Sequence, residues 1–240
     1  MGKYLGLDSS TQSLTGLVID TDDGAISTEV SIGFDAHFAE QYGVENGVIE
    51  LGDGVVHSAP LMWADALDLL FKTLQSQGVD LGQIRSISGS GQQHGTVYLH
   101  ASAGPALAEL TPQRSLAEQL EPVFSRATSP IWMDTSTDQQ CAQLEAGVGG
   151  RDTLLHLTGN TAFERFSGPQ IRKFYQEEPE SYAQTHSISL VSSFMASVLA
   201  GKLVGVDPGD ASGTNLMDIR SRQWSAKALE ATAPALIEKL

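Results

Sequence analysis

The opening of the chain carries the pattern that decides its fold. Residues 3–20 read KYLGLDSSTQSLTGLVID, which is two short apolar runs joined by a polar loop. We predict strands over residues 3–8 and 14–20, because short apolar runs with polar boundaries are typical of buried strands. Residues 20–24 read DTDDG, where Asp-Gly favours a tight hairpin that leads into a third strand at 25–32. These three strands predict an antiparallel meander.

Helices and strands alternate in the rest of the chain. Within residues 57–76, leucine and phenylalanine recur at three- and four-residue spacing, which predicts a helix with one apolar face that ends near Gly78. Residues 100–130 are rich in alanine, serine and proline, and we expect a loosely ordered insertion there. A meander followed by this alternation indicates an α/β layered domain. The other predicted elements are strands at 84–88 and 96–99 and helices at 134–146, 168–177 and 190–200.

Composition narrows the class of protein and its partners. The 240 residues carry a formal net charge of −15, and so acidic a surface repels nucleic acids and anionic membranes. No apolar stretch is long enough for a membrane span, and the N-terminus carries no secretory signal. Cys141 is the single cysteine, so no intrachain disulfide can form. These features predict a cytoplasmic protein without nucleic-acid or membrane partners.

The loop between the first two strands is the first candidate site. Asp8 ends a predicted strand, and the hydroxyls of Ser9, Ser10 and Thr11 follow it. A carboxylate held by a sheet, followed by hydroxyls and backbone N–H groups, can face a phosphate or a hydrated metal ion. The alternative is a turn in which these side chains cap a hairpin.

Two further segments carry polar side chains that suit a sugar or an anion. Gln93 and His94 lie in a glycine-bounded segment where a ligand can approach the backbone, although a single histidine is more often structural. Metal binding by His94 is not favoured, because no other His, Cys or pair of acids lies nearby at the spacing of metal ligands. Arg165 lies between two phenylalanines and can reach a polyol or an anion, or can pair with Glu164 instead.

A pair of acids forms a fourth candidate. Asp207 and Asp210 lie in a loop rich in glycine and proline, where they can hold a metal ion, act as a base or cap the next strand. We favour the structural role, in which they cap that strand.

In chain order, these motifs resemble those of the FGGY carbohydrate kinases, which share the ribonuclease-H-like fold of actin and hexokinase. Residues 4–11, YLGLDSST, resemble the first phosphate motif of that family. Residues 90–95, SGQQHG, are similar to the Gly-Gln-Met-His-Gly element of its xylulokinase branch, with Gln93 at the methionine position. Four later stretches are similar to the same branch, at 131–137, 164–171, 188–194 and 210–214.

The resemblance implies a fold and a reaction. It implies a three-layer α/β/α domain with a mixed sheet, in which residues 1–240 form the N-terminal, sugar-binding domain. It implies transfer of a phosphoryl group from ATP, with Mg²⁺, to the terminal hydroxyl of D-xylulose. Asp8 then matches the catalytic acid near the metal, followed by phosphate-binding residues Ser9, Ser10 and Thr11. The matching sugar-binding residues are Gln93, His94 and Arg165.

The same resemblance implies that part of the machinery lies elsewhere. In these kinases the general base is the aspartate of a Gly-Asp-Asn or Gly-Asp-Gln motif in a C-terminal, ATP-binding domain, and this chain contains neither triplet. We therefore expect the chain to need its own C-terminal domain as a partner and to be inactive alone. A kinase of ribulose or glycerol and a non-catalytic sugar-binding module remain alternatives. The oligomeric state stays open, with a homo-oligomer among the options.

Overall fold

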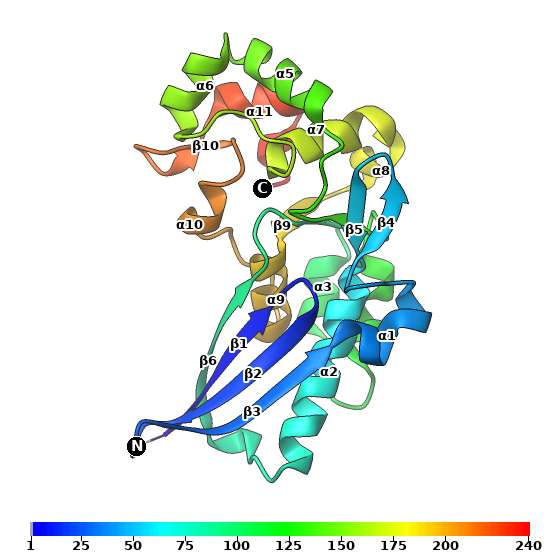
Figure 1. Ribbon diagram of the computed structural model, residues 1–240, viewed down its shortest axis with the longest axis vertical. Coiled ribbons are helices and arrows are strands. Elements are labelled where there is room, and N and C mark those ends of the chain that lie inside the picture. The colour runs from blue at the N-terminus through cyan, green and yellow to red at the C-terminus, as the bar shows by residue number, and fades with distance from the viewer. Residues whose placement is uncertain (1) are drawn as a thin grey trace.

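The predicted meander forms the centre of the computed structural model, which describes residues 2–240 (Figure 1). Strands β1 (Lys3–Ser9), β2 (Ser13–Asp20) and β3 (Ala25–Gly33) pair antiparallel in sequence order. Strand β6 (Ile84–Gly91) then pairs parallel with β1, which gives a mixed sheet of order β3-β2-β1-β6. The sheet confirms the α/β class that the sequence predicts.

Alternation along β1 gives the sheet two different faces. Leu5 and Leu7 are buried, whereas Tyr4 before them and Asp8 after them are exposed. Helices α2 (Pro60–Ser76) and α9 (Val191–Ala200) cover the buried face. Gly16 of β2 makes this packing possible, because a Cβ atom at that position would lie 3.1 Å from Cδ1 of Leu70 in α2.

Many of the other elements lie beyond the end of the sheet at which β1 and β6 finish (Figure 1). The helices are α1 (Phe34–Tyr42), α3 (Ala103–Ala108), α4 (Leu116–Leu120), α5 (Asp138–Gly147), α6 (Arg151–Thr158), α7 (Ser167–Glu177), α8 (Pro179–Gln184), α10 (Pro208–Ala211) and α11 (Ala226–Thr232). The strands are β4 (Ile49–Gly52), β5 (Val55–Ser58), β7 (Thr96–Leu99), β8 (Ser129–Pro130), β9 (Ser187–Leu190), β10 (Met217–Asp218) and β11 (Gln223–Trp224). Short 3₁₀ turns occupy Leu81–Gln83, Glu121–Val123 and Leu236–Glu238.

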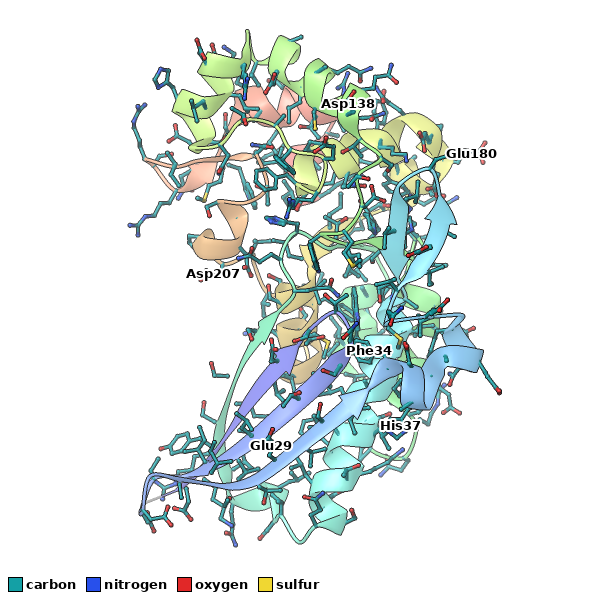
Figure 2. All side chains as sticks on the ribbon, viewed as in Figure 1. Glu29, Phe34, His37, Asp138, Glu180 and Asp207 are labelled. Atoms are coloured by element: carbon teal, nitrogen blue, oxygen red, sulfur yellow. The ribbon has the colours of Figure 1, made fainter. Side chains whose placement is uncertain are left out.

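Two hydrophobic cores stabilise the molecule. The larger core lies between the sheet and α2, and it includes Trp63 and Phe34, which are fully buried. Phe34 lies inward at the start of α1, whereas His37 on the same helix lies at the surface (Figure 2). The second core lies among α5, α7 and α11 and centres on Phe174. The antiparallel pair β7–β9 lies between the two cores (Figure 1).

Residues 100–130 depart from the sequence-based expectation. The prediction that this segment is loosely ordered is wrong. Helices α3 and α4 form in it, and Leu107, Leu120 and Val123 are buried. Helix α4 begins with a capping box in which Ser115 and Glu118 satisfy each other's backbone N–H groups. That pattern, Ser-x-x-Glu, is visible in the sequence and indicates a helix start.

The predicted helix boundaries need smaller corrections. Residues 55–58 form β5, so the helix expected from residue 57 begins at Pro60. Strand β5 is held between β4 and β8, and these tertiary pairings decide its conformation. Among residues 2–240, no helix combines the length and the apolar character that crossing a membrane requires.

We predict that Leu70→Ala lowers the free energy of unfolding by about 2–5 kcal/mol, because it leaves a cavity beneath the sheet. Leu51→Ala is the matched control, since Leu51 is 56% exposed and its truncation should change stability by less than about 0.5 kcal/mol. Urea unfolding followed by circular dichroism measures both. Equal effects of the two changes would contradict this account of the core.

Candidate functional site

The parallel pairing of β1 with β6 creates a polar hollow. Because parallel strands end at the same edge of a sheet, the segments that follow Ser9 and Gly91 emerge side by side. A hollow of about 300 Å³ lies there, and segments near residues 132 and 165 complete its wall. Its lining residues are Asp8, Ser10, Thr11, Gly91, Gln92, Gln93, His94, Trp132 and Arg165. The hollow thus brings together every predicted site residue except Ser9.

Asp8 lies at the sheet end of the hollow, where two hydroxyls hold its carboxylate. Ser90 Oγ donates a hydrogen bond to Asp8 Oδ1 at 2.7 Å, and Ser10 Oγ donates to Asp8 Oδ2. Carboxylate and hydroxyl oxygens are hard donors of the kind that Mg²⁺ accepts, with water and phosphate oxygens completing its shell. Within residues 2–240, no group of three or more His, Cys, Asp or Glu side chains could hold a metal ion. Asp8 therefore fits a metal that is shared with a ligand, and it does not fit an all-protein cage.

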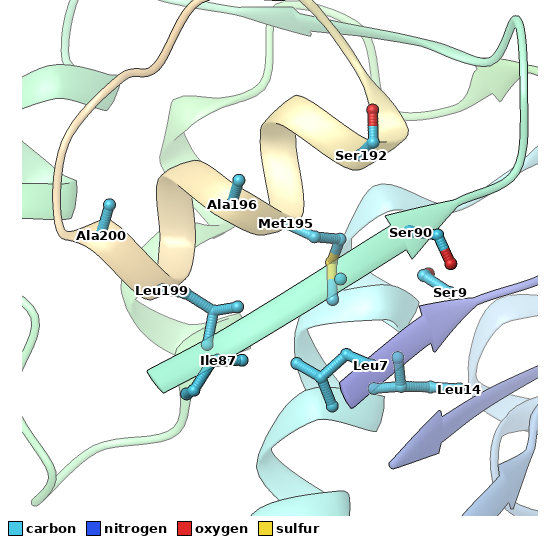
Figure 3. A pocket seen from close by; sticks show the side chains of 11 residues that line it. Leu7, Ser9, Leu14, Ile87, Ser90, Ser192, Met195, Ala196, Leu199 and Ala200 are labelled. Carbon is cyan, nitrogen blue, oxygen red and sulfur yellow. The ribbon is translucent and has the colours of Figure 1, made fainter. Parts of the chain in front are cut away.

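Ser9 is placed on the other side of the sheet. Successive side chains of a strand point to opposite faces, so Ser9 is buried beside the helices while Asp8 is exposed. Ser9 lines a separate cavity together with Leu7 of β1 and with Met195 and Leu199 of α9 (Figure 3). The Ser9 hydroxyl thus lies outside the hollow, and this placement does not favour the predicted contact with phosphate.

His94 is held in a strained conformation inside the hollow. Its φ angle is +66°, and the Gly95 N–H donates to the Gln93 carbonyl across it, which defines a γ-turn. The imidazole packs against Phe166 with ring centroids 4.8 Å apart. A side chain other than glycine in this backbone region costs of order 1–3 kcal/mol and tends to occur at functional sites.

The protonation of His94 follows from its surroundings. Burial lowers the pKa of His94 below its ordinary value near 6.5, and the charge of Arg165 acts in the same direction. Nδ1 lies 3.0 Å from the Gly213 carbonyl, which can only accept a hydrogen bond. The neutral imidazole therefore carries its proton on Nδ1, and Nε2 is left as an acceptor.

Arg165 projects into the hollow from the segment before α7. Its guanidinium carbon lies 4.6 Å from the ring centroid of Phe163, a cation–π contact that orients the charge. The predicted alternative, an ion pair with Glu164, does not form among the described residues. The Glu164 carbonyl instead accepts hydrogen bonds from Thr137 and Gln170 and so fixes the base of this segment.

The glycines on either side of His94 allow helix packing, whereas the sequence suggested that they allow a ligand to approach the backbone. A Cβ atom at Gly91 would lie 2.8 Å from the Ser192 nitrogen, and one at Gly95 would lie 2.8 Å from Cγ2 of Val191. Both glycines therefore allow the start of α9 to pack closely against this segment. Close approach of a ligand is not needed to explain them.

Two residues of the hollow were not singled out from the sequence. Trp132 donates from Nε1 to Thr11 Oγ1 at 2.8 Å, so its indole joins the wall to the Asp8 loop. Gln92 has both polar side-chain atoms buried without a hydrogen-bond partner. The tryptophan stands in the stretch 131–137 that carries the family resemblance, which is the one signal that could have indicated it.

A buried carboxylate supports the wall behind Trp132. Asp134 is fully buried and accepts hydrogen bonds from the Val56 N–H, from Ser136 and from Gln170 Nε2. His57 Nε2 lies 3.8 Å from the same carboxylate. Burial is the main cause that lowers the pKa of His57 to about 4. The charge of Arg126 lowers this pKa further and outweighs the opposite effect of Asp134.

The other chemically suggestive side chains have structural surroundings. Asp207 and Asp210 have structural roles, but the prediction that they cap the next strand is wrong. Asp207 Oδ1 accepts from the Gly209 N–H at 2.7 Å and caps the start of helix α10. Asp210 accepts from Ser192 Oγ and so joins α10 to α9. Burial raises the pKa of the Cys141 thiol to about 12, which removes it as a nucleophile at neutral pH.

Comparison with known proteins now shows which family the chain resembles. Residues 123–238 match a family model described as the FGGY family of carbohydrate kinases, N-terminal domain. The matched segment includes Trp132 and Arg165, and the Asp8 and His94 segments precede it.

Individual relatives extend the similarity over nearly the whole chain. The chain is 48% identical over 239 residues to xylulose kinase 2 of Arabidopsis thaliana, and 44% identical over 237 residues to a xylulose kinase of Rattus norvegicus. These alignments cover 99% and 98% of this chain but 42% and 44% of the relatives. The chain therefore spans less than half the length of the curated relatives that it matches.

A solved structure supports the fold. A crystal structure of a kinase from Brucella ovis, described as a xyloylose kinase, superposes with a TM-score of 0.78 at 23% identity. It covers 99% of this chain and 42% of the Brucella chain. At this level of identity the likeness concerns the fold alone, and it confirms the predicted ribonuclease-H-like α/β class.

We predict that the buried His57 makes stability depend on pH between about 6.5 and 4. The unfolded state takes up a proton near pH 6.5 but the folded state only near pH 4, so stability falls as pH falls through this window. The full effect is roughly 3 kcal/mol. Denaturant unfolding at several pH values should show a flatter profile for His57→Gln. The exposed His37→Gln serves as control, and an unchanged profile in His57→Gln would contradict the prediction.

Proposed function

We propose that this chain is the sugar-binding half of an ATP-dependent kinase that phosphorylates D-xylulose to D-xylulose 5-phosphate. One observation carries the proposal: a single hollow joins the Asp8 loop to His94 and Arg165. It thereby combines an oxygen-rich end suited to a phosphate and metal with an end suited to hydroxyls. The names of the relatives from Arabidopsis thaliana and Rattus norvegicus supply the sugar.

His94, Arg165 and Gln93 bind the sugar in this proposal. His94 Nε2 accepts a hydrogen bond from a sugar hydroxyl, because Nδ1 is committed to the Gly213 carbonyl. Arg165 donates to hydroxyl or carbonyl oxygens from a guanidinium that Phe163 orients. Trp132 adds a flat apolar surface for the C–H groups of the sugar, which is a common use of an aromatic ring with one polar edge.

Asp8 works at the phosphate end. ATP is the second substrate, and its γ-phosphoryl group is transferred to the terminal hydroxyl of the sugar while ADP leaves. Asp8, with Ser10 and Ser90 holding its oxygens, would bind Mg²⁺, which supplies neutralisation of phosphate charge. Thr11 and the backbone of the loop orient the phosphate. Ser9 can contribute only through its backbone, because its hydroxyl lies across the sheet.

The complete reaction needs groups from outside this chain. Residues 2–240 place no second carboxylate in the hollow to accept the proton of the attacking hydroxyl. In the proposed kinase that base and the rest of the ATP site come from a C-terminal domain, which closes over the hollow and excludes water. A cytoplasmic location, expected from the N-terminal sequence, the lack of a long apolar stretch and the single cysteine, stays part of this proposal.

A kinase of another ketose or polyol is the alternative. The hollow supplies donors and an acceptor that any polyol can use, and a few contacts decide among such sugars. The proposal therefore commits to xylulose on the similarity to relatives named xylulose kinase. It is open to direct test against ribulose and glycerol.

We predict that D-xylulose binds the purified chain and that His94→Ala weakens binding about tenfold or more, because an oriented acceptor is lost. Isothermal titration calorimetry measures this, with ribulose and glycerol as competing ligands and the exposed His37→Ala as control variant. Binding of ribulose or glycerol in preference to xylulose would replace the sugar in the proposal. No binding of any of the three in the chain extended through its C-terminal domain would overturn the sugar site itself.

We predict that sugar affinity stays constant from about pH 8 to 6.5 and falls at lower pH. Protonation of His94 converts its Nε2 from acceptor to donor, and burial places that event below the ordinary pKa near 6.5. Calorimetric titrations from about pH 8 to well below pH 6.5 locate the midpoint of the loss of affinity. A midpoint above pH 6.5 would contradict the assignment of His94 as a neutral acceptor.

A further inference from the structure

Gly213 touches His94 in two ways, although the two residues are far apart in the sequence. It lies just after α10, and its carbonyl oxygen is 3.0 Å from His94 Nδ1. Its own lack of a side chain leaves the space that the imidazole fills. A Cβ atom at this position would lie 2.6 Å from Cε1 and 3.0 Å from Nδ1 of the ring.

The imidazole borders the hollow but is restrained by other groups around it. Phe166 covers it with ring centroids 4.8 Å apart. The backbone of His94 is fixed as well, because Ser167 Oγ donates to the His94 carbonyl at 3.1 Å and the γ-turn closes across the residue. Phe166 and Ser167, which hold His94, are the N-cap and the first residue of α7, and they follow directly on Arg165.

We propose that Gly213 is a positioning residue for the sugar site. Its carbonyl fixes the His94 tautomer with the proton on Nδ1, and its missing side chain allows the ring to sit between residue 213 and Phe166. The inference deepens the proposed function and rests on it for the identity of the ligand. The tautomer and the seating of the ring are properties of the free chain.

This arrangement has a consequence for specificity. An Nε2 atom without a proton can accept a hydrogen bond but cannot donate one, so the group that it recognises must carry a hydrogen. A hydroxyl satisfies this requirement, whereas a ketone or an ether oxygen in the same position does not. Gly213 thus acts on the choice between sugar oxygens without touching the sugar.

The test compares Gly213→Ala with Gly205→Ala. Gly205 is the matched control, because a Cβ atom there meets nothing within 4 Å. Long-range ¹H–¹⁵N correlation spectra of the imidazole report the tautomer in the free chain, and calorimetry with D-xylulose reports affinity. We expect the Nδ1-protonated form in the wild type and in Gly205→Ala. In Gly213→Ala we expect a mixture of tautomers and binding weaker by about tenfold.

The outcomes separate this inference from the proposed function. An Nε2-protonated His94 in the wild type overturns the inference, and that spectrum decides even if Gly213→Ala fails to fold. Wild-type tautomer and wild-type affinity in a folded Gly213→Ala also overturn it. If the tautomer changes as expected but xylulose does not bind the wild type, the positioning of His94 by Gly213 stands and the proposed sugar is wrong.

Discussion

The pairing of β1 with β6 is the constraint on which the site depends. These strands are distant in sequence but parallel and adjacent in the sheet, so Asp8 and the segment that leads to His94 emerge at one edge. An antiparallel pairing would send the two segments to opposite ends of the sheet. Helices α2 and α9 pack on one face of the sheet, where Leu5 and Leu7 of β1 are buried, and they leave this edge open.

The region around His94 shows how the fold offsets local strain. A histidine with φ of +66° persists only when its neighbours over-determine it. Ser167 and Phe166 hold it from α7, and Gly213 holds it from the segment after α10. The second core anchors α7 through Phe174 and Ile171, so the hydrophobic packing far from the hollow fixes the geometry inside it.

Local sequence patterns predicted the elements that local interactions decide. The meander and the start of α7 could be predicted from apolar periodicity, whereas the grouping of Asp8 with His94 and Arg165 followed only from the resemblance to a family. The burial of Ser9 follows from strand alternation alone and could have been predicted too. Trp132 could not, because its place in the wall depends on the buried Asp134 and on tertiary pairing of β5 with β8. The order of residues 100–130 likewise comes from packing of Leu107 and Leu120.

The charges that line the hollow differ between its two ends, which is consistent with the different roles that we propose for them. Among its lining residues Asp8 is the one carboxylate and Arg165 the one permanent cation, in a chain of net charge −15. An ATP phosphate that approaches Asp8 meets a like charge, and the interaction is favourable only with a divalent cation between the two. A neutral sugar would interact with Arg165 without such an intermediary. In the proposed reaction the phosphate end therefore requires a metal ion, whereas the proposed sugar-binding residues do not, so sugar binding by this chain should not depend on Mg²⁺.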